Sequence, residues 1–402
     1  MTRLRTVSVS ERLARHRAFA SAFAFIAMLP LLVISVAATS PPKTPLGLPD
    51  APPHESAERI ALGRKLFFDR RLSANNTLSC GMCHIPSQAF ASTQTATAVG
   101  FLGQSLRRNA PSLLNVVYQK TLFHDGHETD LAQQAWLPMI ASDEMANLSM
   151  GQVLGRIRAL PDYNGEFEKA FDGHGPSMQT VGDAIAAYEK TLLSGNSRFD
   201  RWRFGDEKDA LTPQEQRGYE LFVGKAGCVS CHAIEESTAL FTDHKFHDTG
   251  IGYHATIAPD DKTYDVQLAP GTFIKMHADQ LRSVSEPLKN DLGRFEVTLN
   301  PHERWAYKTP SLRNVALTSP YMHDGSLPSL DAVLDYYDRG GIPHDGQADE
   351  IHPLGLSAAE KSDIIAFLKS LNGDQAELEA MAAAESSRHY SPLPIAAEDG
   401  AR

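Results

Sequence analysis

Several features are scarce in this chain of 402 residues, and each scarcity excludes a class of protein. Four Cys are too few for a disulfide framework of this length. The 38 Lys and Arg are outnumbered by 49 Asp and Glu, and the net charge of −11 argues against binding to nucleic acid or anionic lipid. Strand-like alternation is also rare, with Phe295 to Leu299 as the best case. The 42% of hydrophobic residues nevertheless excludes a disordered chain.

The chain has one long apolar run, and it lies at the amino terminus. Residues 1–17 contain five Arg and one Glu, and an apolar stretch from Ala18 to Ala38 follows and ends in small residues. This order is typical of a secretory signal, so residues 1–38 are predicted to direct export to the periplasm. An uncleaved membrane anchor is the alternative, but Pro30 favours cleavage, after which no stable membrane contact is expected. Cleavage changes the net charge from −11 to −15, because five Arg and one Glu are removed.

The rest of the chain is predicted to be mainly α-helical, with long irregular connections. Amphipathic patterns and helix-start signals predict four helices, at residues 55–68, 181–193, 212–223 and 357–371. The last of these has a capping box, because Ser357 stands three residues before Glu360.

One sequence pattern occurs twice. Pro-Ser-Leu-x-Asn-Val begins at Pro111 and again at Pro310, and a His-Asp-Gly follows each Pro by 13 residues, at His124 and His323. This repetition, with a length that exceeds what one core usually serves, predicts two domains of one plan. We expect them to comprise residues 39–205 and 206–374. Residues 375–402 are expected to form a poorly ordered tail.

All four Cys lie in two Cys-x-x-Cys-His motifs. The motifs consist of Cys80, Cys83 and His84 and of Cys228, Cys231 and His232. Two Cys at this spacing can each form a thioether to one vinyl group of a haem, and the following His then ligates the iron. A zinc site built from four thiolates is the alternative, but it gives no role to the two His. The motifs therefore predict two covalently bound haem c groups.

The ordered set of motifs resembles the bacterial dihaem cytochrome c peroxidase and MauG family across nearly all of residues 55–373. The stretches that carry the resemblance are LGRKLFFDRRLS, RNAPSLLN, FHDG, SRFDRW and KTPSLRNVALTSPYMHDG. The resemblance implies two cytochrome c-like haem domains and an oxidoreductase that uses hydrogen peroxide. It also implies that the haem of the first domain is the peroxide site.

The resemblance implies three residues above the first haem. The family has a Gln, a Pro and a Glu in this pocket, and they match Gln134, Pro138 and Glu144. Glu144 is expected to move a proton between the peroxide oxygens, Gln134 to hold the bound oxygen, and Pro138 to shape the pocket. For Glu144 the alternative is a solvated helix residue. No His or Met occurs between the first motif His and His124, so we expect an open first iron that needs no prior reduction.

The second haem needs a ligand from its own domain. A helix at residues 329–339 places Leu330 and Tyr337 on one face and Tyr336 elsewhere, and periodicity alone makes Tyr337 a core aromatic. By resemblance, Tyr337 is instead the iron ligand, because MauG-like members have Tyr where peroxidases have Met, 14 residues after the second His-Asp-Gly. Met322 is the alternative ligand. A phenolate stabilises oxidised iron, so this haem would suit the storage of an oxidising equivalent.

The resemblance further implies one calcium ion between the domains. Its ligands would be the side chain of Asn109 and two carbonyls, which match Thr318 and Pro320. An isolated Asn would otherwise be interpreted as a turn residue.

Two positions depart from the family. His124 stands where a Trp lies between the haems, so His124 and Trp136 are candidate relays, and Ala226 stands where MauG has the Trp that withdraws electrons from its partner. Two functions stay open: peroxide-driven oxidation of a partner protein, favoured by Tyr337, and peroxide detoxification fed by a small cytochrome c or cupredoxin. A simple electron carrier is disfavoured by Glu144 and Gln134.

Overall fold

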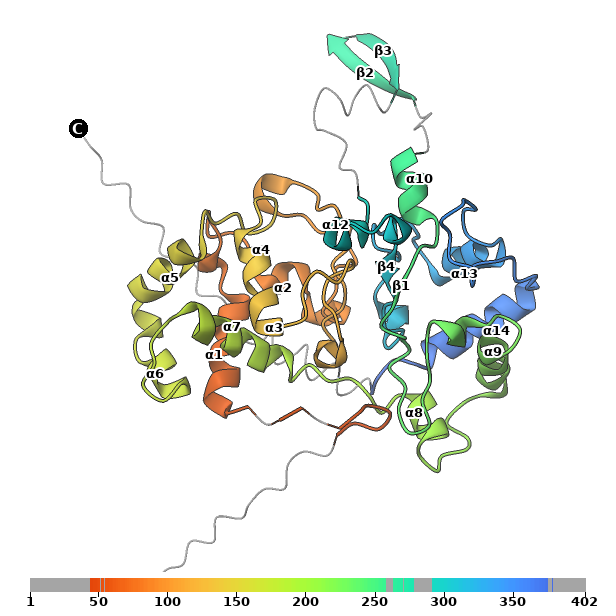
Figure 1. Ribbon diagram of the computed structural model, residues 1–402, viewed down its shortest axis with the longest axis horizontal. Coiled ribbons are helices and arrows are strands. Elements are labelled where there is room, and N and C mark those ends of the chain that lie inside the picture. The colour runs from red at the N-terminus through yellow and green to blue at the C-terminus, as the bar shows by residue number, and fades with distance from the viewer. Residues whose placement is uncertain are drawn as a thin grey trace, which may run out of the picture. The chain divides into compact units, whose positions relative to one another are not determined.

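The computed structural model describes residues 44–50, 52–53, 55–257, 263–269, 271–277, 291–374 and 378. The predicted signal peptide and all but one residue of the predicted tail lie outside these ranges. The described residues are rich in helix and contain a few short strands, as Figure 1 shows, so the prediction of a mainly α fold is confirmed. None of the described helices combines the length and the apolar character that a membrane crossing requires.

The first hydrophobic core lies between α1 (Ala57–Phe68) and α7 (Met178–Glu189). The two helices approach closely at Gly63, where a Cβ would collide with the backbone carbonyl of Ala184. Ser56 begins α1 by accepting a hydrogen bond from Arg59 N at 3.2 Å. The other helices around this core are α2 (Cys80–Cys83), α3 (Leu131–Gln134), α4 (Trp136–Ile140), α5 (Met150–Ala159) and α6 (Glu166–Ala170).

The second core is dominated by Phe side chains. They are contributed by Phe199, Phe222, Phe241 and Phe367. The helices here are α8 (Arg198–Arg203), α9 (Pro213–Val223), α13 (Leu330–Asp338) and α14 (Ala358–Lys369). The predicted starts of α9 and α14 are confirmed, because Thr212 and Ser357 each form a complete capping box.

Two small antiparallel sheets complete the described part. The strand β1 (Phe246–His247) pairs with β4 (Tyr307–Lys308), and β2 (Thr263–Ala269) forms a hairpin with β3 (Thr272–His277). The helix α10 (Ile251–Ile257) precedes this hairpin in the chain. The sequence carries a hairpin signal that the prediction missed, because Pro270-Gly271 separates two runs rich in β-formers.

The best case of strand-like alternation, at residues 295–299, does not form a strand, because Phe295–Thr298 is a helical turn, α12. Leu299 ends this helix with a φ of 56° after its N–H donates to Phe295 O at 2.9 Å. Val297 and Leu299 are exposed and lie on no sheet. A short alternation without a partner strand therefore had no sheet to stabilise it.

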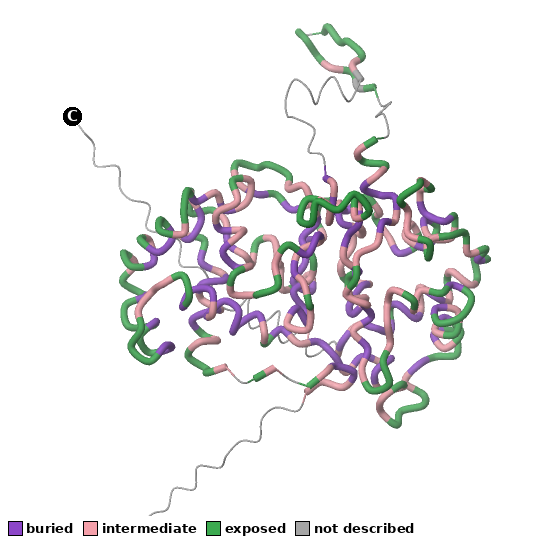
Figure 2. The backbone as a smooth tube through the Cα atoms, viewed as in Figure 1, coloured by how far each residue is buried: buried purple, intermediate pink, exposed green. Residues whose placement is uncertain are grey.

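The two Pro-Ser-Leu-x-Asn-Val segments have the same local form. In each, the Asn takes a positive φ (63° at Asn115 and 61° at Asn314) and a 3-10 turn follows. Both Asn side chains contact Ser194: Asn115 Nδ2 donates to its carbonyl at 2.8 Å, and Asn314 Nδ2 donates to its hydroxyl at 2.9 Å. Figure 2 shows buried backbone mainly in the interior and exposed backbone mainly on the outer loops. Ser194 thus joins the two segments at one buried point.

A buried ion pair provides a second connection. Arg313 donates to both carboxylate oxygens of Asp200 at 2.8 Å, and these side chains are 2% and 0% exposed. The same guanidinium donates to the carbonyls of Gly47 and Ala239 at 2.7 Å. The pair therefore holds the segment before α1 against the second core.

Candidate functional site

A cavity with about 590 Å³ of empty space lies against the first Cys-x-x-Cys-His motif. Its lining includes the motif residues Cys80, Cys83 and His84 together with the three predicted pocket residues Gln134, Pro138 and Glu144. The structure thus brings together side chains that are up to 64 positions apart in the chain. Much of the remaining wall is apolar, with Phe67, Leu113 and Ile185 among its members.

Short elements of the first core place the polar residues of this cavity. Gln134 ends α3 and Pro138 lies within α4, while Glu144 stands in the turn that follows. That turn is held from both sides, because the Asn147 amide donates to Leu72 O at 2.7 Å and to Met139 O at 2.8 Å. Glu144 is therefore carried on a fixed turn above the motif.

The carboxyl group of Glu144 has a pKa close to neutral pH. Burial, and secondarily the charge of Asp143, raise the pKa of Glu144 to about 7. A group with such a pKa exchanges a proton readily near pH 7, as general acid–base catalysis requires. Its lining position and its pKa both favour the functional interpretation over a solvated helix residue.

The two motif His rings are each held through Nδ1. His84 Nδ1 lies 3.2 Å from Phe90 O and 3.1 Å from Pro111 O, and His232 Nδ1 lies 2.9 Å from Phe241 O. Because carbonyl oxygens only accept hydrogen bonds, Nδ1 carries the proton and Nε2 keeps its lone pair. Burial lowers the pKa of both rings, which keeps them neutral. Metal-ligating His residues are typically held in this way.

The thiols also fit haem attachment better than a zinc cluster. All four are free, and burial raises the pKa of Cys83 to about 11 and that of Cys228 to about 12. Cys80 packs against the first core and Cys228 against the second. Among the described residues, the one cluster of Cys, His and acidic side chains able to hold a metal contains a single motif Cys, Cys231. Each core therefore has its own pair of Cys followed by a His, and this arrangement suits two thioether-bound haems.

Tyr337 lies in the neighbourhood of the second motif. Burial raises its pKa, and the smaller contributions come from Tyr336, Cys231 and Cys228, which therefore lie near its hydroxyl. The helix α13 that carries Tyr337 begins at the N-cap Ser329 and buries Leu330 in the second core. The predicted ligand position is thus next to the second pair of Cys.

Comparisons with known proteins agree with this arrangement. Residues 57–208 match the family "Di-haem cytochrome c peroxidase". The chain is 38% identical over 338 residues to the methylamine utilization protein MauG of Methylorubrum extorquens, covering 82% of this chain and 84% of that protein. It is 37% identical to a cytochrome c peroxidase of Pseudomonas sp., covering 82% of this chain and 85% of that protein.

The chain belongs to the di-haem cytochrome c peroxidase family. It is accordingly a dihaem oxidoreductase of the cytochrome c peroxidase and MauG type. Among solved structures, it is similar to a MauG-like protein associated with microbial copper homeostasis, with a TM-score of 0.66 at 31% identity, over 88% of this chain and 99% of that one. It is also similar to a diheme peroxidase of Burkholderia thailandensis, with a TM-score of 0.62 at 26% identity, over 80% of this chain and 87% of that one.

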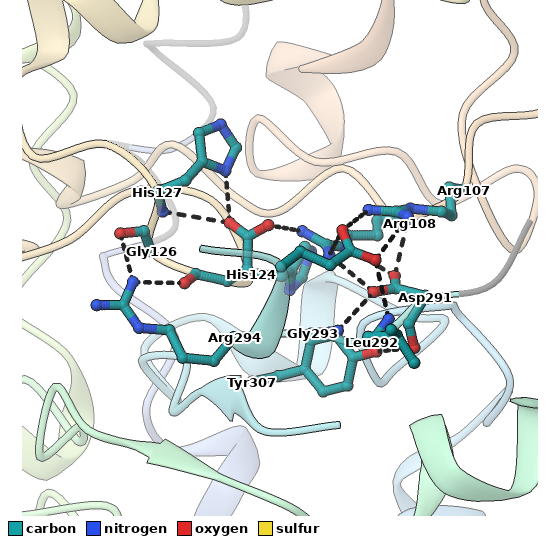
Figure 3. Close-up of polar contacts among 12 residues, drawn as sticks. Arg107, Arg108, His124, Gly126, His127, Asp291, Leu292, Gly293, Arg294 and Tyr307 are labelled. Carbon is teal, nitrogen blue, oxygen red and sulfur yellow. Dashed lines mark hydrogen bonds and ion pairs between the residues drawn. The ribbon is translucent and has the colours of Figure 1, made fainter. Parts of the chain in front are cut away.

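An ionic network lies between segments of this dihaem protein that are far apart in sequence (Figure 3). Arg108 donates to Asp125 at 2.6 Å and to both oxygens of Asp291 at 2.7 Å. Arg107 pairs with Glu296 at 2.6 Å, and Arg294 donates to the Asp125 carbonyl at 2.8 Å. These bonds fasten residues 291–296 to the turn that contains the first His-Asp-Gly.

The two predicted relays occupy different surroundings. His124 donates from Nε2 to Asn109 O at 2.9 Å, and burial lowers its pKa to about 3, with a smaller contribution from the nearby His323. Trp136 is buried and donates from Nε1 to Met178 O at 2.9 Å. Their roles as relays stay predictions.

Tyr307 is a residue that sequence reasoning missed. Its ring stacks on that of His323 at 3.6 Å between centroids, with 12° between the planes. His323 belongs to the second His-Asp-Gly and lies near His124 of the first. No motif marks Tyr307, because the stack depends on the pairing of β4 with β1.

Glu189 was also missed. It is the last residue of α7, is 4% exposed and lines the first cavity. Its Oε2 has no hydrogen-bond partner among the described residues, and burial raises its pKa to about 8. After burial itself, the charge of Glu189 is the largest influence that raises the pKa of Cys80, which places the two side chains close together. An acid on the otherwise apolar run AIAAY was the available signal.

The predicted calcium ligand Asn109 contacts the turn that follows Pro320. Its N–H donates to His323 O at 2.6 Å, and its Nδ2 donates to Ala96 O at 2.8 Å. Thr318 and Pro320 precede this turn. The calcium ion itself stays a prediction.

Proposed function

We propose that this dihaem protein uses hydrogen peroxide at its first haem and oxidises a partner protein, as a MauG-like enzyme. The observation that carries the proposal is Tyr337, a phenol near Cys228 and Cys231 where, by resemblance, peroxidases of the family have a thioether. A phenolate ligand favours oxidised iron, and such a site holds an oxidising equivalent instead of waiting as an electron reservoir. Haem, when bound, supplies the redox chemistry that takes up the two oxidising equivalents of peroxide.

The residues of the first cavity handle the protons of the peroxide. Glu144 in its carboxylate form would take the proton from one peroxide oxygen and return it to the other, which would then leave as water. Gln134 would hold the deprotonated oxygen through its amide, and Pro138 shapes the wall without offering a ligand or a donor. The pKa of Glu144, at about 7, suits both halves of this transfer.

The first site is proposed to be open in the resting protein. No His or Met occurs in the loop from residue 91 to residue 108, so this segment offers no side chain of the kind that blocks the iron in some relatives. A resting electronic spectrum should contain a five-coordinate or water-bound component without prior reduction. A spectrum that shows only low-spin, six-coordinate haem would contradict this.

Peroxide detoxification with electrons from a small cytochrome c or cupredoxin is the second candidate. Several relatives bear the name cytochrome c peroxidase, among them proteins of Nitrosomonas europaea and Escherichia coli. The net charge of −11 suits a basic donor. Steady-state turnover of peroxide with reduced cytochrome c separates the two functions, because fast turnover supports detoxification and its failure supports oxidation of a partner protein.

The remaining assignments complete the proposal. We infer an exported periplasmic protein whose two cytochrome c-like domains, residues 39–205 and 206–374, arose from one repeated plan, and a calcium ion held by Asn109, Thr318 and Pro320. The matching turns at Asn115 and Asn314 support the repeat, and the two separate cores support the domain division. Metal analysis of the purified protein, with two irons and one calcium expected, tests the cofactor set.

A further inference from the structure

A row of aromatic rings leads from Tyr337 to the half-buried indole of Trp305. The ring of Tyr336 lies 5.6 Å from that of Tyr337, edge to face. The ring of His344 stacks on Tyr253 at 4.1 Å with 6° between the planes, and Trp305 lies 5.2 Å from Tyr253 and 5.7 Å from His344. We call these five residues the Trp305 row.

A polar link joins the two halves of the row. The Tyr336 hydroxyl donates to Thr249 O at 2.5 Å, and the neighbouring Asp248 places Oδ2 3.1 Å from His344 Nε2. The Gly346 N–H donates to His344 Nδ1 at 3.2 Å, and His344 Nε2 lies close to the carboxylate without forming a hydrogen bond to it. The two halves of the row are therefore connected through the chain at Asp248 and Thr249, which makes one polar contact with each half.

Close packing fixes the surface end of the row. The helix α10 carries Tyr253 and begins beside two glycines without room for a side chain. A Cβ on Gly250 would collide with Ile342 O, and one on Gly252 would lie 3.1 Å from the Cβ of Trp305. The start of α10 is therefore in close contact with Ile342 and Trp305.

The chemistry of the row favours Trp305 as its terminal group. Oxidation of a Tyr usually requires a base that takes the phenolic proton, and Tyr336 instead donates to a carbonyl, which is not a base. Trp can lose an electron while it keeps its Nε1 proton, and that N–H donates to Thr256 Oγ1 at 3.2 Å. Trp305 is also one of two half-buried Trp residues, whereas Trp136 is buried.

We propose that oxidising equivalents leave the second site through the Trp305 row, and that Trp305 is the group that takes electrons from the partner protein. This inference rests on the proposed function and supplies an exit where the chain has Ala226 in place of the Trp used by MauG. For each peroxide, two electrons pass one at a time from an electron-rich aromatic side chain of the partner through Trp305. The partner also releases two protons, so that one peroxide becomes two waters.

The test uses the haem-loaded protein and hydrogen peroxide alone, with no partner. Wild type, Trp305→Phe and the matched control Trp202→Phe each receive one equivalent of peroxide. Trp202 is a suitable control because it is also half-buried but packs on Phe199 and Tyr219 in the second core. Electron paramagnetic resonance detects Trp radicals, and peptide mass spectrometry locates added oxygen.

The proposal expects a Trp radical and oxygen addition at Trp305 in wild type and in Trp202→Phe, and loss of both in Trp305→Phe. Trp305→Tyr should recover part of the radical signal, which a purely structural role would not predict. Oxidation at Trp202 or Trp136 in place of Trp305 overturns the exit path, and so does an unchanged radical in Trp305→Phe. Neither result contradicts the proposed function as long as a lasting oxidised state still forms. Absence of any lasting oxidised state in wild type overturns the proposed function, and this inference with it.

Discussion

Replacement of Glu144 by Gln should remove the proton transfer on which the reaction with peroxide depends. Gln keeps the shape of the side chain but cannot take up a proton. General acid–base groups typically contribute about 10²–10⁴ in rate, so we expect a loss of that size in the second-order rate constant for peroxide. Rapid mixing of the oxidised protein with peroxide, followed by absorbance, measures this constant directly.

The rate constant for peroxide should also depend on pH, through the ionisation of Glu144. With a pKa of about 7, Glu144 is ionised in about a tenth of molecules at pH 6, half at pH 7 and nine-tenths at pH 8. Because the carboxylate form accepts the peroxide proton, the rate constant should rise with pH and level off above pH 8. The Gln variant should show no such rise.

Asp143→Asn provides the matched control, because the charge of Asp143 helps to raise the pKa of Glu144. This variant should shift the pH profile towards lower pH and leave the plateau rate unchanged. A Glu144→Gln variant that reacts at the wild-type rate, or a wild-type profile that is flat from pH 5 to pH 9, would refute the assignment.

Three further predictions concern the rest of the molecule. Tyr337→Met should raise the midpoint potential of the second haem by on the order of 100 mV in a spectroelectrochemical titration, because a thioether favours reduced iron; an unchanged potential would exclude Tyr337 as a ligand. Burial raises the pKa of Glu189 from 4.5 to about 8, so the folded chain holds a proton that the unfolded chain releases, and the free energy of unfolding should fall as pH rises through this interval. Chemical denaturation should show a smaller fall in Glu189→Gln, and an equal fall would contradict the assignment. Arg313→Met should lower the free energy of unfolding by about 3–5 kcal/mol because it leaves Asp200 charged and buried, and the double change Arg313→Met with Asp200→Leu should recover most of that loss.

Local signals in the sequence were reliable where they act within one turn of chain. The capping box at Ser357 forms as predicted, and the helix predicted at residues 212–223 begins after Thr212 with a capping box of its own. Each needs only a side chain and the backbone three residues later. The Cys-x-x-Cys-His motifs are equally local. The pocket residues Gln134 and Glu144 were found through family resemblance, and the structure brings them to the cavity of the first motif.

Features that depend on distant segments were not predicted. The stack of Tyr307 on His323 requires residues 16 positions apart to meet, and the Trp305 row draws on three separate stretches of chain. Glu189 has no motif, and its significance comes from burial beside Cys80. The alternation at residues 295–299 belongs to a helical turn at Phe295–Thr298, because alternation over five residues does not show whether a partner strand exists.

The central claim is that oxidising equivalents are kept for a partner protein. It is tested most directly by adding one equivalent of peroxide to the oxidised, haem-loaded protein and recording its absorbance without any electron donor. The account predicts a changed spectrum that forms on mixing and persists, and that reduced cytochrome c does not rapidly discharge. A spectrum that reverts at once, or that reduced cytochrome c discharges in rapid repeated turnovers, would contradict it.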